Sequence, residues 1–252
     1  MNPCFMAAHM PDGSRAAFSG GRRVAFFGGS FDPPHRGHLA IARAALSALG
    51  LDTVLFAPVG AQPLKPSGST ASFEDRVAMT RLAIESETAF TLSLADAPAV
   101  NGTPNYTIDT LIRLRADLRD DGALFCLMGA DSFLGLRRWH RGAAIPFVAP
   151  LIVASRPGEP IGELTQILPA GLTIEKDLET VCTHNGVELR TGTLRNSAGA
   201  STPFYLLPGL HIDISASQIR QQVRAAAGRL AAGHDLLPDA VSAYIADHQL
   251  YQ

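Results

Sequence analysis

The sequence predicts an α/β fold: a doubly wound, Rossmann-like sheet that is mostly parallel, with helices on both faces and a small helical part at the C-terminus. Apolar runs of strand length alternate with helix-patterned segments between residues 24 and 158, and this alternation is typical of parallel sheets. The first strand, helix and second strand fit within about 35 residues, the length of a right-handed βαβ unit. The chain has 252 residues, of which 46% are apolar, and this is enough to bury a sizeable core.

The first βαβ unit begins at VAFF, residues 24–27, an apolar run that is ended by two glycines, as expected for a buried strand before a tight turn. From about Pro34 to Leu49 the apolar residues follow helical spacings, and the next residue is Gly50, a typical C-terminal stop. The apolar run at residues 53–59 supplies the second strand.

The alternation continues along the chain. Helical patterns cover 73–86, 107–118 and a stretch through Trp139, and strand patterns cover 90–96, 123–129 and 150–158. Residues 192–203, rich in Gly, Ser and Thr, are expected to form a flexible loop between possible short strands. Two helical segments, 215–233 and 238–251, complete the pattern.

The expected organisation is one domain with an extension. Residues 1–22 are interpreted as a loose N-terminal extension, and residues 23–252 as a single domain. Within that domain, residues 158–210 are expected to be a variable loop region and residues 214–252 to be the C-terminal helices. The sequence contains no internal repeat.

Composition and charge disfavour several classes of partner. The formal net charge is −2, without an acidic or basic tail, which disfavours binding to nucleic acid by charge alone. No apolar run is long enough to span a bilayer, and residues 1–20 lack the apolar segment of a secretion signal. Cys4, Cys126 and Cys182 are odd in number and widely spaced, so we interpret them as free thiols in a reducing cytoplasm. We therefore expect a cytoplasmic protein without a membrane or nucleic-acid partner.

The loop GGSFDPPHRGH, residues 28–38, lies where open parallel sheets bind ligands, after the first strand. It matches neither the P-loop nor the dinucleotide fingerprint. Its small residues let a ligand approach the backbone, and its prolines lead into a helix whose first turn carries His35 and His38. Two imidazoles at a helix N-terminus favour a phosphate site. A solvated turn or part of a zinc site are the alternatives.

A second anion-binding pattern occurs in HIDISASQIRQQVR. Ser215 and Gln218 have the spacing of a capping box, which places a helix start near Ser215 and directs the N–H of Ser217 outward. Arg220 follows one turn into this helix. Alone this pattern indicates only a capped helix, but with the first loop it suggests two helix N-termini that converge on one polyphosphate.

The two segments resemble the paired signatures of the nucleotidyltransferase superfamily, H-x-G-H at residues 35–38 and I-S-x-x-x-I-R at residues 214–220. Five further stretches resemble the bacterial nicotinate-nucleotide adenylyltransferases: PVGAQPLKP, PNYTIDTL, FCLMGADSFLGLRRWH, VASRPG and LLPDAVSAYIADHQLY. The resemblance extends from about residue 24 to residue 251 and is weakest between residues 158 and 210.

This resemblance implies transfer of the adenylyl group of ATP to nicotinate mononucleotide, with deamido-NAD and pyrophosphate as products. The attacking phosphate is already an anion, so alignment and charge neutralisation are needed but a general base is not. His38 is expected nearest the α-phosphate and Arg220 on the β- and γ-phosphates, while Mg²⁺ arrives with ATP instead of occupying a site made by protein alone. The implied catalytic residues are His35, His38, Lys65 and Arg220. The implied ATP-binding residues are Gly28, Gly29, Ser30, Phe31, His35, His38, Ser217 and Arg220.

For the mononucleotide, the resemblance implies Lys65, Thr107, Asp131 and Trp139. Trp139, the only tryptophan, would stack on the pyridine ring, although a lone tryptophan is also a common core residue. Thr107 matches a position near the pyridine carboxylate, and Asp131 would accept from a ribose hydroxyl or cap a helix. Lys65 would draw two anionic substrates together or be an ordinary surface lysine. The family commonly has histidine before this lysine, whereas this chain has Leu64.

Three alternatives stay open. The acceptor could be nicotinamide mononucleotide, or both mononucleotides, because the preference for the acid comes from the resemblance alone. The chain could be an inactive nucleotide-binding regulator, although both histidines, Lys65 and Arg220 are present. A metallohydrolase would use His35 and His38 as zinc ligands. The oligomeric state does not follow from the sequence.

Overall fold

A computed structural model gives the fold of residues 21–61, 64, 68–100, 102–118, 120–155, 168–175, 178–182, 187–210, 215–225 and 236–252. The strands are β1 (Arg23–Gly29), β2 (Thr53–Pro58), β3 (Phe90–Leu92), β4 (Ala123–Gly129), β5 (Leu151–Ala154), β6 (Leu172–Ile174), β7 (Glu179–Cys182), β8 (Glu188–Asn196) and β9 (Ser201–Leu207). The helices are α2 (Arg36–Leu49), α3 (Phe73–Ile84), α4 (Thr107–Asp117), α5 (Ala130–Gly135), α6 (Ile145–Val148), α8 (Ala216–Ala225) and α9 (Asp239–Asp247). Two short 3₁₀ helices, η2 (Leu136–Arg138) and η3 (Gly142–Ala144), follow α5.

Within the described residues, nine strands form one sheet in the order β3-β2-β1-β4-β5-β9-β8-β6, with β7 paired to β8. The six strands from β3 to β9 along this order are parallel, while β6, β7 and β8 are antiparallel additions. The chain moves outward from β1 to β3, then returns to the other side of β1 to form β4 and β5. This reversal between β1 and β4 is the position where doubly wound sheets bind ligands.

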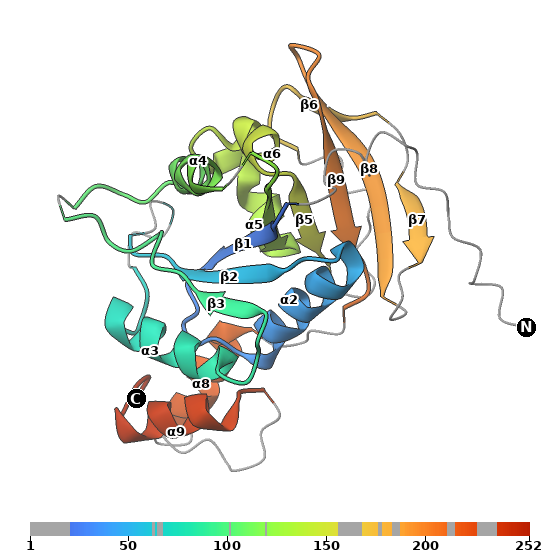
Figure 1. Cartoon of the computed structure of the whole chain (residues 1–252). Coiled ribbons are helices and arrows are strands. Elements are labelled where there is room, and N and C mark those ends of the chain that lie inside the picture. The colour runs from blue at the N-terminus through green and yellow to red at the C-terminus, as the bar shows by residue number, and fades with distance from the viewer. Residues whose placement is uncertain are drawn as a thin grey trace, which may run out of the picture.

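Helices cover both faces of the sheet because alternate residues of each parallel strand point to opposite faces. In β1, Ala25 and Phe27 belong to a core shared with α2, α3, α8 and α9. Val24 and Phe26 belong to a second core shared with α4, α5 and α6. In Figure 1, α4 and α6 lie on one side of the sheet and α3, α8 and α9 on the other. The predicted doubly wound fold is therefore confirmed.

The prediction of a flexible loop at residues 192–203 is wrong. Most of these residues belong to β8 and β9, which form an antiparallel hairpin from Arg190 opposite Leu206 to Arg195 opposite Ser201. The hairpin forms because β9 pairs in parallel with β5 and buries Phe204 and Leu206. The Gly- and Ser-rich composition that suggested a loop describes only the turn, where Gly199 has a φ of 86°.

Other boundaries differ slightly from the predictions. The first predicted helix begins at Arg36 with His35 as its N-cap, and the strand predicted for residues 90–96 has only three residues. The helix predicted for residues 215–233 is present to Ala225, and the rest of it lies outside the described residues. Of the extension predicted for residues 1–22, residues 1–20 also lie outside the described residues. In the part of the chain described here, none of the helices has the length and apolar character needed to cross a bilayer.

Candidate active site

Among the described residues, two adjoining cavities open at the carboxyl ends of β1 and β4. The histidine cavity, of about 510 Å³, is lined by His38 and Arg220. The tryptophan cavity, of about 550 Å³, is lined by Thr107 and Trp139. Both volumes lie in the range of small-molecule sites. The residues that line both cavities are Gly28, Gly29, Ser30, Asp131 and Ser132.

The histidine cavity brings together all the residues predicted to bind ATP. These come from two segments far apart in the sequence, the loop between β1 and α2 and the start of α8. They are Gly28, Gly29, Ser30, Phe31, His35, His38, Ser217 and Arg220. Arg220 connects the two segments directly, because its Nη1 donates to the main-chain oxygen of Asp32 at 2.6 Å across 188 residues of sequence.

His35 and His38 form a stacked pair at the N-terminus of α2. Their ring centroids are 3.8 Å apart with an angle of 29° between the planes. The backbone N–H of His35 donates to Nδ1 of His38 at 3.1 Å, so a neutral His38 carries its proton on Nε2. Burial, and after it the charge of His35, lower the pKa of His38 well below its usual value. His38 is therefore a neutral imidazole with a fixed Nε2–H donor.

Phe31 lines the histidine cavity, and its ring supports the ring of His38. Its side chain is only 1% exposed and packs edge-on against Phe27 and against His38, with ring centroids 5.6 and 5.0 Å away. Its φ of 46° is unusual for a residue with a Cβ. Nearby, a Cβ added at Gly28 would lie 2.8 Å from the ring of Phe26, so a larger residue there would force this buried ring to shift.

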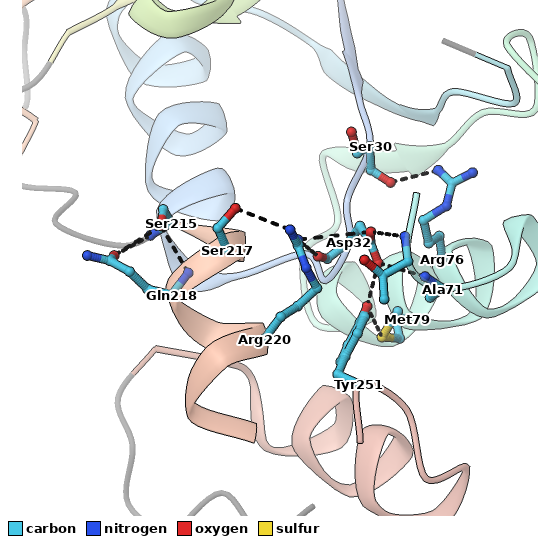
Figure 2. Close-up of polar contacts among 11 residues, drawn as sticks. Ser30, Asp32, Ala71, Arg76, Met79, Ser215, Ser217, Gln218, Arg220 and Tyr251 are labelled. Atoms are coloured by element: carbon cyan, nitrogen blue, oxygen red, sulfur yellow. Dashed lines mark hydrogen bonds and ion pairs between the residues drawn. The ribbon is translucent and has the colours of Figure 1, made fainter. Parts of the chain in front are cut away.

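The predicted capping box at the start of α8 is confirmed. The backbone N–H of Gln218 donates to Oγ of Ser215 at 3.2 Å, and the backbone N–H of Ser215 donates to Oε1 of Gln218 at 3.2 Å. Nη2 of Arg220 donates to Oγ of Ser217 at 3.2 Å, as Figure 2 shows. The cap thus places Ser217 and Arg220 together beside the β1–α2 loop.

Asp32 is a central residue that the sequence analysis missed. It is 4% exposed, and its carboxylate accepts from the backbone N–H groups of Thr70 at 2.6 Å and Ala71 at 3.1 Å. It also accepts from the hydroxyl of Tyr251 at 2.8 Å and lies 3.9 Å from Nη1 of Arg220. Asp32 therefore joins four segments around the histidine cavity (Figure 2). Its only local signal was its position in the loop before two prolines.

Arg76 of α3 is a second missed residue. It is 2% exposed, and its guanidinium donates to the main-chain oxygens of Ser30 at 2.7 Å and Val59 at 2.8 Å. Burial lowers the pKa of Arg76 from its usual value, but an arginine this basic stays charged at neutral pH. Arg76 thus fixes the loops after β1 and β2 relative to each other.

The tryptophan cavity contains three of the residues predicted to bind the mononucleotide: Thr107, Asp131 and Trp139. Trp139 is partly buried and also packs against the core on the α4 side of the sheet. Its backbone N–H donates to the oxygen of Leu136 and its own oxygen accepts from Gly142, both at 3.0 Å. An added Cβ at Gly142 would lie 2.2 Å from the oxygen of Leu136, so this turn requires glycine.

Polar and aromatic residues that were not predicted also line the tryptophan cavity. The rings of Tyr106 and His140 pack together in a tilted arrangement, with centroids 4.3 Å apart and 34° between the planes. Asp96 is 2% exposed and accepts from Oγ1 of Thr110 at 2.5 Å. Burial is the main reason that the pKa of Asp96 is raised above its usual value. The position of Asp96 after a strand could have suggested it, whereas nothing in the sequence separates His140 from a surface histidine.

Two predictions concern the loop after β2. Lys65 lies outside the described residues. Leu64 is 48% exposed and lines the tryptophan cavity, so an apolar side chain stands where the family commonly has an imidazole.

Asp131 is the second residue of α5, whose N-cap is Gly129, so Asp131 is not the cap of this helix.

A metal ion held only by protein would need several ligating side chains close together. Among the described residues, no group of three or more His, Cys, Asp or Glu side chains is placed to hold one. Mg²⁺ commonly keeps several waters and binds substrate phosphates, so the residues of the histidine cavity are compatible with a nucleotide-bound Mg²⁺.

Residues 26–222 match the model of the cytidylyltransferase-like family. The chain is thus an enzyme of the nucleotidyltransferase class, in agreement with the two helix N-termini that meet at its histidine cavity. Two similar proteins, each named "Probable nicotinate-nucleotide adenylyltransferase", come from Geobacter sp. (strain M21) and Trichlorobacter lovleyi. The first is 36% identical over 91% of this chain and 98% of its own length. The second is 38% identical over 91% and 99%. The chain belongs to the nicotinate-nucleotide adenylyltransferase family.

Solved structures show the same fold. Plasmodium falciparum nicotinic acid mononucleotide adenylyltransferase, complexed with APC or with NaAD, gives TM-scores of 0.61 and 0.63. Each comparison covers 91% of this chain and 97% of the other at 15% sequence identity. At this identity the likeness concerns the fold.

Proposed function

We propose that this enzyme transfers the adenylyl group of ATP to nicotinate mononucleotide, producing deamido-NAD and pyrophosphate for NAD biosynthesis. The observation that carries the proposal is the convergence of the N-termini of α2 and α8 on one cavity that adjoins an aromatic-lined second cavity. The proposal is supported by relatives named for this reaction that align over almost their whole length. Cytoplasmic ATP and mononucleotide would be its substrates.

In the histidine cavity, we assign the ATP phosphates to His35, His38, Ser217 and Arg220, with Gly28 to Phe31 along the nucleotide. The Nε2–H of His38 is a donor for the α-phosphate, where negative charge must be stabilised during attack. Arg220 supplies a forked pair of N–H groups for the β- and γ-phosphates. Because the acceptor phosphate is already ionised, these residues orient and neutralise charge but remove no proton.

We assign Mg²⁺ to the triphosphate, with which it enters the site. Bound there, it would neutralise charge on the phosphate oxygens. In this arrangement, the side chains of the histidine cavity act on phosphate oxygens and do not form a metal cage.

In the tryptophan cavity, we assign Trp139 to the pyridine ring and Asp131 to a ribose hydroxyl. Thr107 is the first residue of α4, so the first N–H groups of this helix are available for the pyridine carboxylate. Asp131 lines both cavities, as expected for a residue near the reacting groups. Lys65 remains the proposed bridge between the two anionic substrates.

The test of the function is turnover of the purified protein with ATP and each mononucleotide in parallel. We expect deamido-NAD from nicotinate mononucleotide in the presence of Mg²⁺, far slower turnover of nicotinamide mononucleotide, and no turnover when Mg²⁺ is omitted and EDTA is added. A strong preference for the amide would refute the assigned acceptor. ATP binding without any turnover would instead identify a nucleotide-binding regulator, and stoichiometric zinc would favour a metallohydrolase.

Replacing Trp139 by alanine is expected to raise KM for the mononucleotide about tenfold, since stacking on one face of a ring contributes about 1 kcal/mol beyond area burial. KM for ATP should change less than about twofold, because no ATP contact is removed. Steady-state kinetics with each substrate varied in turn measures both values. Trp139→Phe is the matched control and should lose less. An equal rise in both KM values would show that Trp139 acts through folding and not through stacking.

A further inference from the structure

The segment after α9 places Tyr251 against the loop that carries the predicted phosphate-binding residues. Tyr251 is 5% exposed, and its hydroxyl donates to Oδ1 of Asp32 at 2.8 Å across 219 residues of sequence. Figure 2 shows the hydroxyl of Tyr251 and the guanidinium of Arg220 both directed toward Asp32, from two different segments of the chain. Burial, and after it the charge of Asp32, raise the pKa of Tyr251, so the hydroxyl keeps its proton and remains a donor.

The two oxygens of the Asp32 carboxylate have different partners. Oδ1 accepts from Tyr251 and from the backbone N–H of Ala71 at 3.1 Å. Oδ2 accepts from the backbone N–H of Thr70 at 2.6 Å and lies 3.9 Å from Nη1 of Arg220. The closer partner of this Nη1 is the main-chain oxygen of Asp32, at 2.6 Å. The hydrogen bonds donated to the Asp32 carboxylate thus weaken its electrostatic attraction for Arg220. The guanidinium of Arg220 therefore stays at the wall of the histidine cavity.

We propose that Tyr251 is a positioning residue for ATP, which acts by holding the Asp32 carboxylate so that Arg220 stays directed toward the triphosphate. The proposal rests on the function proposed above, because it gives Arg220 its role there. Without the hydroxyl of Tyr251, a buried Oδ1 keeps one N–H donor, and the less neutralised carboxylate attracts the guanidinium more strongly. Arg220 then moves toward Asp32 and binds phosphate less well.

The chain offers a matched control for the loss of this hydroxyl. Tyr244 lies on α9 and its hydroxyl donates to Oδ1 of Asp75 at 2.9 Å. Tyr244 and Tyr251 therefore both join the C-terminal segment to a carboxylate. The other oxygen of the Asp75 carboxylate accepts from the hydroxyl of Ser72 at 2.7 Å, and Asp75 is not among the residues that line the histidine cavity. Substitution by phenylalanine removes one hydroxyl from either tyrosine and keeps the ring.

The experiment compares Tyr251→Phe with Tyr244→Phe by calorimetric titration with a non-hydrolysable ATP analogue and by steady-state kinetics. For Tyr251→Phe we expect Kd for the analogue and KM for ATP to rise about fivefold, with KM for the mononucleotide unchanged. Tyr244→Phe should leave all three values near those of the unmodified protein. Equal effects of the two variants on ATP affinity, or equal changes in both KM values, would overturn the proposal.

A double-mutant cycle with Arg220→Ala tests the path through the guanidinium. If Tyr251 acts through Arg220, adding Tyr251→Phe to Arg220→Ala should cause no further loss of ATP affinity. A full additional fivefold loss would show that Tyr251 acts otherwise. Calorimetry does not need turnover, so a protein that binds ATP but adenylates no mononucleotide would refute the proposed function while still deciding the role of Tyr251.

Discussion

Replacing His38 by alanine is expected to lower kcat by about 10²-fold or more, the usual cost of removing one donor aimed at developing negative charge. His38 is held by contacts that do not involve substrate: the N–H of His35 donates to Nδ1, and the rings of His35, Phe31 and Phe27 pack against the imidazole. The Nε2–H is therefore presented to the histidine cavity in a fixed orientation, and alanine removes it. The measurement is kcat with both substrates saturating, together with the circular dichroism spectrum to verify the fold.

His248→Ala is the matched control for this substitution. His248 is exposed and stacks on Tyr244 with ring centroids 3.8 Å apart, a ring contact like that of His38 but outside both cavities. We expect this variant to keep kcat within about twofold, because surface substitutions away from special features have small effects. Activity of His38→Ala near that of His248→Ala would contradict the assigned role.

The lowered pKa of His38 predicts a second effect of His38→Ala, on the pH dependence of stability. In the folded protein His38 stays neutral at a pH where the unfolded chain is protonated. Lowering the pH below about 6.5 therefore favours the unfolded state, which takes up a proton on His38 before the folded state does. The free energy of unfolding decreases as the pH is lowered from about 6.5 toward the pKa of His38 in the folded protein. His38→Ala removes this contribution, so its free energy of unfolding, measured by urea titration at several pH values, should fall less.

Local patterns in the sequence were sufficient for the parallel strands β1 to β5 and for both segments of the histidine cavity. The apolar runs of β1 and β4 are buried on both faces of the sheet, so their pattern is continuous and easily recognised. The capping box of Ser215 and Gln218 spans four residues, and the loop at residues 28–38 is equally local. A local pattern can be interpreted without knowledge of the element it packs against.

Long-range contacts could not be predicted in this way. Tyr251 lies 219 residues from Asp32 in sequence, and apolar periodicity only indicates that its ring is buried. Arg76 has a helical pattern around it that gives no sign of a buried guanidinium. The hairpin of β8 and β9 depends on pairing with β5, which overrides the loop-like composition of the turn. In each case the partner, and not the segment itself, decides the structure.

Replacing Arg220 by alanine is expected to lower kcat/KM for ATP by about 10²- to 10³-fold, with a much smaller effect on KM for the mononucleotide. Two losses add in the same direction. The forked donor to the β- and γ-phosphates disappears, and the buried Asp32 carboxylate loses the cation 3.9 Å away, so its charge opposes the incoming triphosphate. Arg220→Lys restores the charge without the fork and should recover only part of the loss.

Arg224→Ala separates this effect from a general loss of positive charge on α8. Arg224 lies one turn beyond Arg220, is exposed and lines neither cavity, so its removal changes the net charge equally without touching the site. The measurement is kcat/KM for ATP at low and at moderate salt concentration. At both concentrations, kcat/KM should change little for Arg224→Ala and fall strongly for Arg220→Ala. Equal losses that vanish at moderate salt would mean that long-range attraction of ATP, which salt screens, explains the result and that Arg220 does not contact the phosphates. A loss confined to Arg220→Ala that persists in salt is expected only from a short-range contact, because screening acts weakly on groups that exclude water between them.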